Sequence, residues 1–185
     1  MNIFLKNKLY RLFTISSAFG NAGRTLFDIA FIIYATSLPN PELAVSIVSI
    51  ATTLPYIISF ILGYVADQTK DKYDRIMSTR FYQFLLFSLF ALVCIYGVQW
   101  WIFIVLVFVN VVADILGGYN GYLSMSINTR LVRKEQLSEA LAFISSINNT
   151  ISLAGKAVGV FVLGLLSYNY SYFGMLNAAL FLIAF

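Results

Sequence analysis

Long apolar stretches separated by short polar connections make up most of this 185-residue chain. Hydrophobic residues account for 60% of the sequence and charged residues for only 11%, a balance that ordinary soluble domains do not have. A helix needs roughly 20 mostly apolar residues to cross a hydrocarbon core about 30 Å thick. The sequence therefore predicts an all-α membrane protein in which residues 1–185 form a single transmembrane bundle. We expect its six helices at residues 12–37, 42–66, 79–98, 100–124, 138–166 and 171–185.

The last of these helices is expected to be incomplete. A helix from residue 171 to residue 185 rises only about 22 Å, which is less than the hydrocarbon thickness. The sequence therefore looks truncated within its sixth helix.

The distribution of Lys and Arg predicts the orientation of the bundle. Ten of the twelve basic residues lie before the first helix or beside the second and fourth connections: Lys6, Lys8, Arg11, Lys70, Lys72, Arg75, Arg80, Arg130, Arg133 and Lys134. The first, third and fifth connections contain none, and short loops rich in Lys and Arg stay in the cytoplasm. We therefore expect a multi-pass protein of the cell membrane, namely a bacterial plasma membrane, with a cytoplasmic N-terminus and a cytoplasmic loop at residues 67–78.

Several classes of function are disfavoured by composition. Histidine is absent, which removes the usual general base and the usual metal ligand. The single cysteine, Cys94, has no partner for an intrachain disulfide. Basic residues form short groups between apolar stretches and no continuous stripe, so nucleic acid is not an expected partner. We therefore expect no enzymatic activity, no metal and no cofactor, and membrane lipid as the surroundings.

Four charged residues interrupt the apolar stretches: Arg24, Asp28, Asp114 and Lys156. A charge at the bilayer centre costs about 2.5–3.5 kcal/mol on insertion scales, so these side chains should face the bundle interior or water. Asn110 lies four residues before Asp114, on the same helix face. Two interpretations remain open: the charges pair with one another, Arg24 with Asp28 and Lys156 with Asp114, or at least one contacts substrate or carries a proton. We expect Asp114 and Lys156 to be electrostatically coupled.

The connection after the second expected helix reads GYVADQTKDKYDR, from Gly63 to Arg75. It resembles the loop signature of the major facilitator superfamily, in which Gly, then Asp four residues later, then basic residues join helices two and three. In this chain those positions are Gly63, Asp67 and the basic residues up to Arg75. The stretches TLPYIISFILGYVAD and RLVRKEQLSEA are similar to the macrolide and multidrug efflux branch of that superfamily.

This resemblance implies the N-terminal half of a twelve-helix secondary transporter that moves a small amphiphilic molecule, as an exporter, by alternating access. Helices one and four would line the cavity, and helices two and five would contact a second six-helix half, from the same gene or another chain. The substrate, with a coupling proton as a second candidate solute, would meet residues from this set: Arg24, Asp28, Asn110, Asp114 and Lys156. Gly63, Asp67 and Arg75 would belong to a loop that locks one conformation.

The alternative is a membrane protein that does not transport, either a remnant or a partner or scaffold that lacks the second half. Reading the gene beyond Phe185 would discriminate between them. Six further encoded helices would favour the transporter, and a stop codon would favour the remnant.

Overall fold

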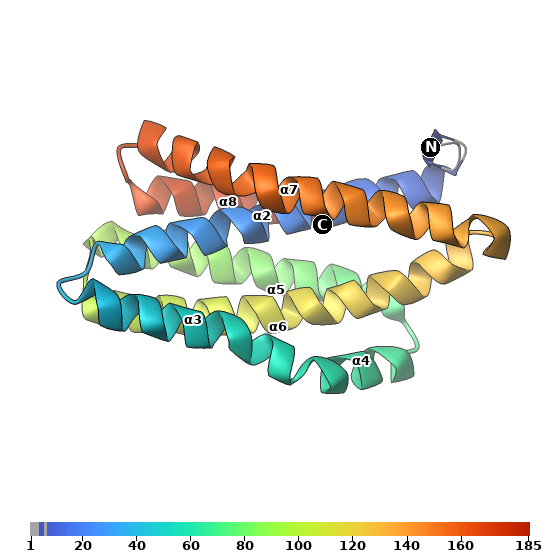
Figure 1. Cartoon of the computed structure of the whole chain (residues 1–185), viewed down its shortest axis with the longest axis horizontal. Coiled ribbons are helices and arrows are strands. Elements are labelled where there is room, and N and C mark those ends of the chain that lie inside the picture. Colours follow the sequence, from blue (N-terminus) through green and yellow to red (C-terminus); the bar gives the residue numbers. More distant parts are fainter. Residues whose placement is uncertain (1–3, 6) are drawn as a thin grey trace.

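The computed structural model describes residues 4–5 and 7–185, and it is a bundle of long α-helices that lie side by side (Figure 1). No strand occurs among the described residues. The all-α prediction is confirmed. The α-helices are α2 (Lys8–Thr36), α3 (Pro41–Ile57), α4 (Ser59–Gln68), α5 (Lys72–Val93), α6 (Trp100–Leu131), α7 (Leu137–Leu165) and α8 (Tyr170–Ala184).

Three helical segments of the described chain are long and apolar enough to cross a membrane: Lys72–Tyr96, Trp100–Leu131 and Lys134–Leu165. The pair α3 and α4 can serve as a fourth, broken span, and α8 is a shorter apolar helix. By the same criterion of length and composition α2 does not qualify, although the sequence predicts a span there.

The position of α2 explains how a more polar helix is accommodated. It packs against α7 and α8, and also against α3 and α6, so that neighbours surround it on several sides. Its N-terminus is fixed by Asn7, whose side chain accepts a hydrogen bond from the Tyr10 amide (3.1 Å) and donates one to the Leu131 carbonyl (3.1 Å). Polar and charged side chains near the middle of α2 line a cavity within the bundle: Asn21, Arg24, Thr25 and Asp28.

Two helices extend further than predicted. α5 begins at Lys72 rather than near residue 79, and α6 continues to Leu131 rather than ending near residue 124. Most of the expected loop at residues 67–78 is thus helical, and only residues 69–71 connect α4 to α5. The prediction ended each helix where apolar residues end, whereas a helix can continue into polar surroundings as long as its backbone hydrogen bonds are made.

The three basic segments gather at one end of the bundle. The N-terminus, the α4–α5 turn and the α6–α7 connection lie there, and the other three connections lie at the opposite end (Figure 1). Lys6, one of the basic residues counted above, lies outside the described residues.

A break divides the second expected helix into α3 and α4, whose axes differ by 41°. Pro55 lies inside the last turn of α3, where its ring removes a backbone donor, and the bend follows at Ile58. Pro55, Tyr56 and Ser59, beside this break, line a cavity of about 570 Å³ within the bundle, so the bend shapes that cavity.

A cluster of phenylalanines holds α2, α5 and α8 together. The ring centroid of Phe27 is 4.9 Å from that of Phe87 and 5.2 Å from that of Phe90, and Phe87 stacks on Phe181 at 4.7 Å. These rings are fully buried. In a membrane the gain comes from van der Waals packing between the rings rather than from removal of apolar surface from water, and this packing joins α2, α5 and α8.

Candidate functional site

A cavity of about 570 Å³ in the bundle contains three of the four charged residues singled out in the sequence. Arg24 and Asp28 reach it from α2, and Asp114 reaches it from α6. The rest of its lining mixes polar and apolar side chains from α2, α3, α4, α6 and α7: Asn21, Thr25, Thr52, Thr53, Pro55, Tyr56, Ser59, Leu62, Gly118, Gly121, Tyr122, Met125 and Ser152. A cavity of this size can enclose a drug-sized molecule.

Asp28 has more charged neighbours than the other carboxylate of the site. The charged groups that act on it electrostatically are Asp114, Arg24 and Lys156. Its Oδ1 atom is buried and has no hydrogen-bond partner among the described residues. An unpartnered carboxylate oxygen beside a cavity is available to a ligand or to a proton.

Asp114 is held by Asn110, one turn earlier on α6. The Asn110 amide donates a hydrogen bond of 3.3 Å to Asp114 Oδ2. Asn110 is fully buried and is not part of the cavity wall, so it orients Asp114 rather than meeting a ligand. Arg24 is the charged group that acts on Asp114.

Arg24 is oriented by amides rather than by the carboxylate one turn away. Its guanidinium donates a hydrogen bond of 3.2 Å to Asn21 Oδ1, and Asn21 donates bonds of 3.3 Å to the backbone and side-chain oxygens of Asn148 on α7. Gly117 leaves room for Arg24, because a Cβ there would lie 2.7 Å from its Nη1. Arg24 thus links α2, α6 and α7.

Lys156 acts electrostatically on Asp28 and is not among the groups that act on Asp114, so the expected coupling of Asp114 with Lys156 stays a prediction. α7 packs along α2 and touches α6 at few positions. The contact between α7 and α2 is close at two glycines, since a Cβ at Gly155 would lie 3.1 Å from Thr25 and one at Gly159 would lie 3.1 Å from Ile29. The Lys156 side chain itself is exposed on this half of the fold.

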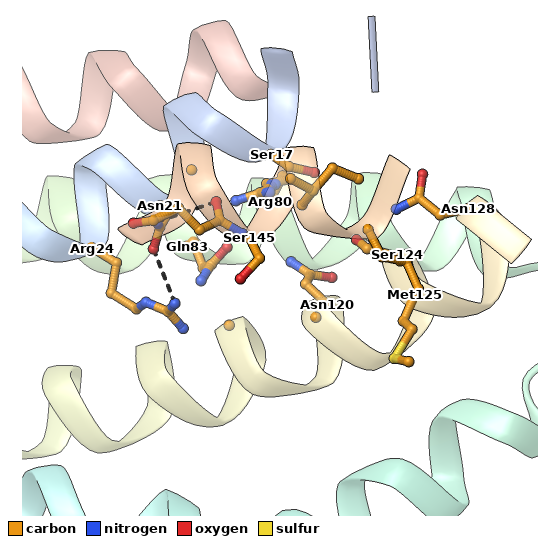
Figure 2. Close-up of a pocket in the computed structure, with 16 residues that line it drawn as sticks. Ser17, Asn21, Arg24, Arg80, Gln83, Asn120, Ser124, Met125, Asn128 and Ser145 are labelled. Atoms are coloured by element: carbon orange, nitrogen blue, oxygen red, sulfur yellow. Dashed lines mark hydrogen bonds between the residues drawn. The ribbon is translucent and has the colours of Figure 1, made fainter. Parts of the chain in front are cut away.

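A second, smaller cavity of about 310 Å³ adjoins the first and shares Asn21, Arg24, Gly121 and Met125 with it. Figure 2 shows this cavity between α2, α5, α6 and α7, with Arg80 among the residues that line it. Arg80 is only 6% exposed. The sequence reading missed it as a site residue, because it was counted among the basic residues that flank the second connection.

The loop signature has a local role that the sequence did not reveal. Lys72 is buried, and its ammonium donates hydrogen bonds to the backbone oxygens of Ala66 and Asp67 at the end of α4. A cation at a helix C-terminus satisfies free carbonyls and offsets the helix dipole. Asp67 and Arg75 are exposed.

Gly63 does not mark a close helix contact within this half. A Cβ placed there would lie 3.8 Å from Tyr122, which is an ordinary van der Waals distance. Any role of Gly63 in the loop signature therefore does not depend on a close contact with α6.

Metal ligation is not indicated in the described part of the chain, where no three His, Cys, Asp or Glu side chains gather. Comparison with curated proteins and with solved structures found no match. A family model described as transmembrane secretion effector matches residues 3–184, which is nearly the whole chain. That family lies within the major facilitator superfamily and has a transporter-type role. The chain, a helical membrane bundle with charged side chains around an interior cavity, therefore belongs to the transmembrane secretion effector family of the major facilitator superfamily.

Proposed function

We propose that this chain forms the N-terminal half of a secondary transporter that exports a small amphiphilic molecule by alternating access. The observation that carries the proposal is the cavity of about 570 Å³, which holds Arg24, Asp28 and Asp114 inside the bundle. Charges in a membrane interior are costly, and they face substrate and ion pathways where they are retained. Transporter sites lie near the bilayer midplane between two related halves.

The lining suits a substrate that is partly apolar. Leu62, Met125 and the rings of Tyr56 and Tyr122 lie in the same wall as the charged groups. Apolar contacts would supply affinity, and the few polar groups would fix the orientation of the molecule.

A second half would cover surfaces that this chain leaves open. α7 is mostly exposed, and its large apolar side chains include Leu153 (76% exposed), Phe161 (67%) and Leu165 (68%). α3 and α4 expose Tyr56, Ile57 and Phe60 in the same way. These two surfaces belong to the helices that the family resemblance assigns to contact with the other half, so the cavity would be closed by that partner.

Asp28 and Asp114 are the candidate proton carriers. They act on one another electrostatically, and two neighbouring carboxyl groups titrate as a coupled pair. Binding of a proton by this pair would weaken its attraction for Arg24 and so favour one conformation of the site.

Transport by membrane vesicles tests the proposal. The gene is expressed with its complete reading frame, inside-out vesicles are prepared, and uptake of ethidium and of carboxyfluorescein is followed before and after a proton gradient is imposed. We expect gradient-dependent uptake of at least one dye, and we expect Asp28→Asn to abolish it. Asp74→Asn, which removes an exposed carboxylate on α5, is the matched control and should leave uptake unchanged. If the uptake of each dye is the same in vesicles with the protein and in vesicles without it, export is contradicted.

The locking role of Asp67 is tested in the same vesicles. Its carboxylate is exposed at the end of α4 and is accessible to a second half. Asp67→Asn should reduce uptake without lowering the amount of inserted protein. Unchanged uptake would limit Gly63 and Asp67 to markers of topology.

A further inference from the structure

We propose that the smaller cavity binds an anionic group, a phosphate, sulfonate or carboxylate, that belongs to an amphiphile. The inference rests on the proposed function and specifies that the amphiphile carries a negative charge. The site lies between α2, α5, α6 and α7 (Figure 2), and it adjoins the cavity that holds Asp28 and Asp114 and shares Arg24 with it.

The charges around this cavity have one sign. Arg24 and Arg80 both line it, and no Asp or Glu does. The charged group that acts on Arg80 is Arg24, which repels it. Arg24 has Asp28 and Asp114 nearby, whereas Arg80 has no carboxylate neighbour of this kind among the described residues. A buried cation without a counter-ion is costly, and a bound anion between the two guanidinium groups would remove that cost.

Unpartnered hydrogen-bonding groups point to a ligand as well. Arg80 Nε is buried and has no partner in the described part of the chain, and the same is true of Asn120 Nδ2. Thr79 donates its hydroxyl hydrogen to Asn120 Oδ1, which leaves the amide N–H groups of Asn120 as donors to the cavity. Two donors beside two positive charges match the oxygens of an anion.

Two acceptors complete the set. Gln83 donates to the Ala113 carbonyl (3.1 Å), and its Oε1 has no partner among the described residues. Asn128 Oδ1, further along α6, is also buried without a hydrogen-bond partner among the described residues. These oxygens suit a hydroxyl or N–H group next to the anionic one.

Local packing places the guanidinium of Arg80 here. Gly20 on α2 is buried against it, and a Cβ at that position would overlap the guanidinium atoms. A side chain at position 20 would therefore force the guanidinium of Arg80 to move from its place between α2 and α5.

Binding of simple amphiphiles to the purified full chain tests the inference. Isothermal titration in a non-ionic maltoside detergent compares hexyl phosphate, hexyltrimethylammonium and inorganic phosphate. We expect hexyl phosphate to bind and hexyltrimethylammonium not to bind. Binding of inorganic phosphate alone would show that the anionic group suffices. Equal affinity for hexyl phosphate and for hexyltrimethylammonium, or preference for the latter, would overturn the proposal.

Three variants locate the site. Arg80→Gln should weaken hexyl phosphate binding about tenfold or more, as expected for the loss of a charge-assisted hydrogen bond. Arg75→Gln removes an exposed arginine from the same helix and should leave the affinity within about twofold. Gly20→Ala keeps both charges but displaces Arg80, and it should weaken binding to a similar extent. If Arg80→Gln does not fold, Gly20→Ala and the comparison of ligands still decide. Unchanged affinity in folded Arg80→Gln would refute the site.

Two further comparisons distinguish a lipid ligand from a soluble one, and binding at this cavity from transport. In nanodiscs, competition between phosphatidylglycerol and hexyl phosphate would assign the site to a lipid headgroup, and its absence would assign it to a soluble amphiphile. Hexyl phosphate binding without transport of either dye would retain the site and refute the exporter. Transport of ethidium without hexyl phosphate binding would support the exporter and refute the anion site.

Discussion

Asp28 combines three charged neighbours with a buried, unpartnered oxygen, and this makes it the most constrained residue of the site. Each isolated charge near a helix centre costs about 2.5–3.5 kcal/mol to insert. The cost of Asp28 is reduced by Arg24 on its own helix and by Lys156 on α7, while Asp114 opposes them. Loss of one cation should therefore affect the carboxylates unequally.

A double-mutant cycle between Asp28 and Lys156 tests this arrangement. Asp28→Asn and Lys156→Met should each lower thermal stability in detergent, and the double variant should lose less than the sum of the two. The interaction should fall within the range of about 0.5–3 kcal/mol that neighbouring residues show.

The same cycle between Asp114 and Lys156 tests the coupling expected from the sequence. The two residues lie on α6 and α7, which make few contacts, and additive losses would contradict that coupling. A larger interaction for Asp114 than for Asp28 would contradict the placement of Lys156 against α2.

Some site residues could be recognised in the sequence and others could not. Arg24, Asp28 and Asp114 interrupt long apolar stretches, and the cost of their insertion alone points to the interior. Arg80 lies where an apolar stretch begins, next to a basic connection, and its sequence neighbours suggest an exposed position. Its guanidinium packs against Gly20, a residue of another helix. The sequence around Arg80 does not reveal a contact with a residue so distant in the chain.

At the scale of elements, α5 and α8 approach each other closely at Gly174. A Cβ there would lie 2.8 Å from the Ala91 Cα and 2.7 Å from Phe90. Gly174→Ala should therefore destabilise the bundle by about 1–3 kcal/mol, as overpacking of a core does, with a lower melting temperature in detergent.

Gly164→Ala on α7 is the matched control, because no atom lies within 4 Å of a Cβ at that position. Alanine favours helix over glycine by up to about 1 kcal/mol, so this variant should be neutral or stabilising. A melting temperature that falls equally in both variants would argue against the close contact of α5 and α8.

The turn between α4 and α5 gives a second prediction at this scale. Lys72→Met removes the ammonium that binds the backbone oxygens of Ala66 and Asp67, and hydrogen bonds to charged groups are worth about 1.5–3 kcal/mol. Amide hydrogen exchange at the end of α4 should become faster. Lys70→Met, at an exposed position in the same turn, should leave the exchange unchanged.

Helix ends were harder to predict than helix identity. The apolar stretches located each helix, but α5 and α6 continue past them into polar sequence. Lys72 illustrates the reason, since the sequence marks it as a loop cation whereas its contacts make it a buried cap for the preceding helix.

At the scale of the whole molecule, the gathering of basic segments at one end predicts the orientation. Cysteines placed at Asn40 and Asp71, both exposed residues that precede a helix, should differ in labelling by an impermeant maleimide added to intact cells. Asn40→Cys should react and Asp71→Cys should not. Cys94 is buried, and Cys94→Ser provides the background for both. Equal labelling would contradict a cytoplasmic N-terminus.

The class of the fold followed from composition, but the neighbours within the bundle did not. Hydropathy cannot tell that α7 lies along α2 or that α5 lies along α8, because lipid-facing and helix-facing apolar residues look alike in sequence. The packing is decided by small residues such as Gly155 and Gly174, whose partners are distant in the chain.

The central position of α2 also has a consequence for synthesis. α2 is made before α7 and α8, the helices that cover much of its surface, and by its own composition it favours the bilayer less than α5 or α6 does. During translation it would have to remain beside the insertion machinery, or stay loosely inserted, until α7 and α8 emerge. The polar residues that line the cavity would therefore make stable insertion of α2 depend on α7 and α8, which are made later.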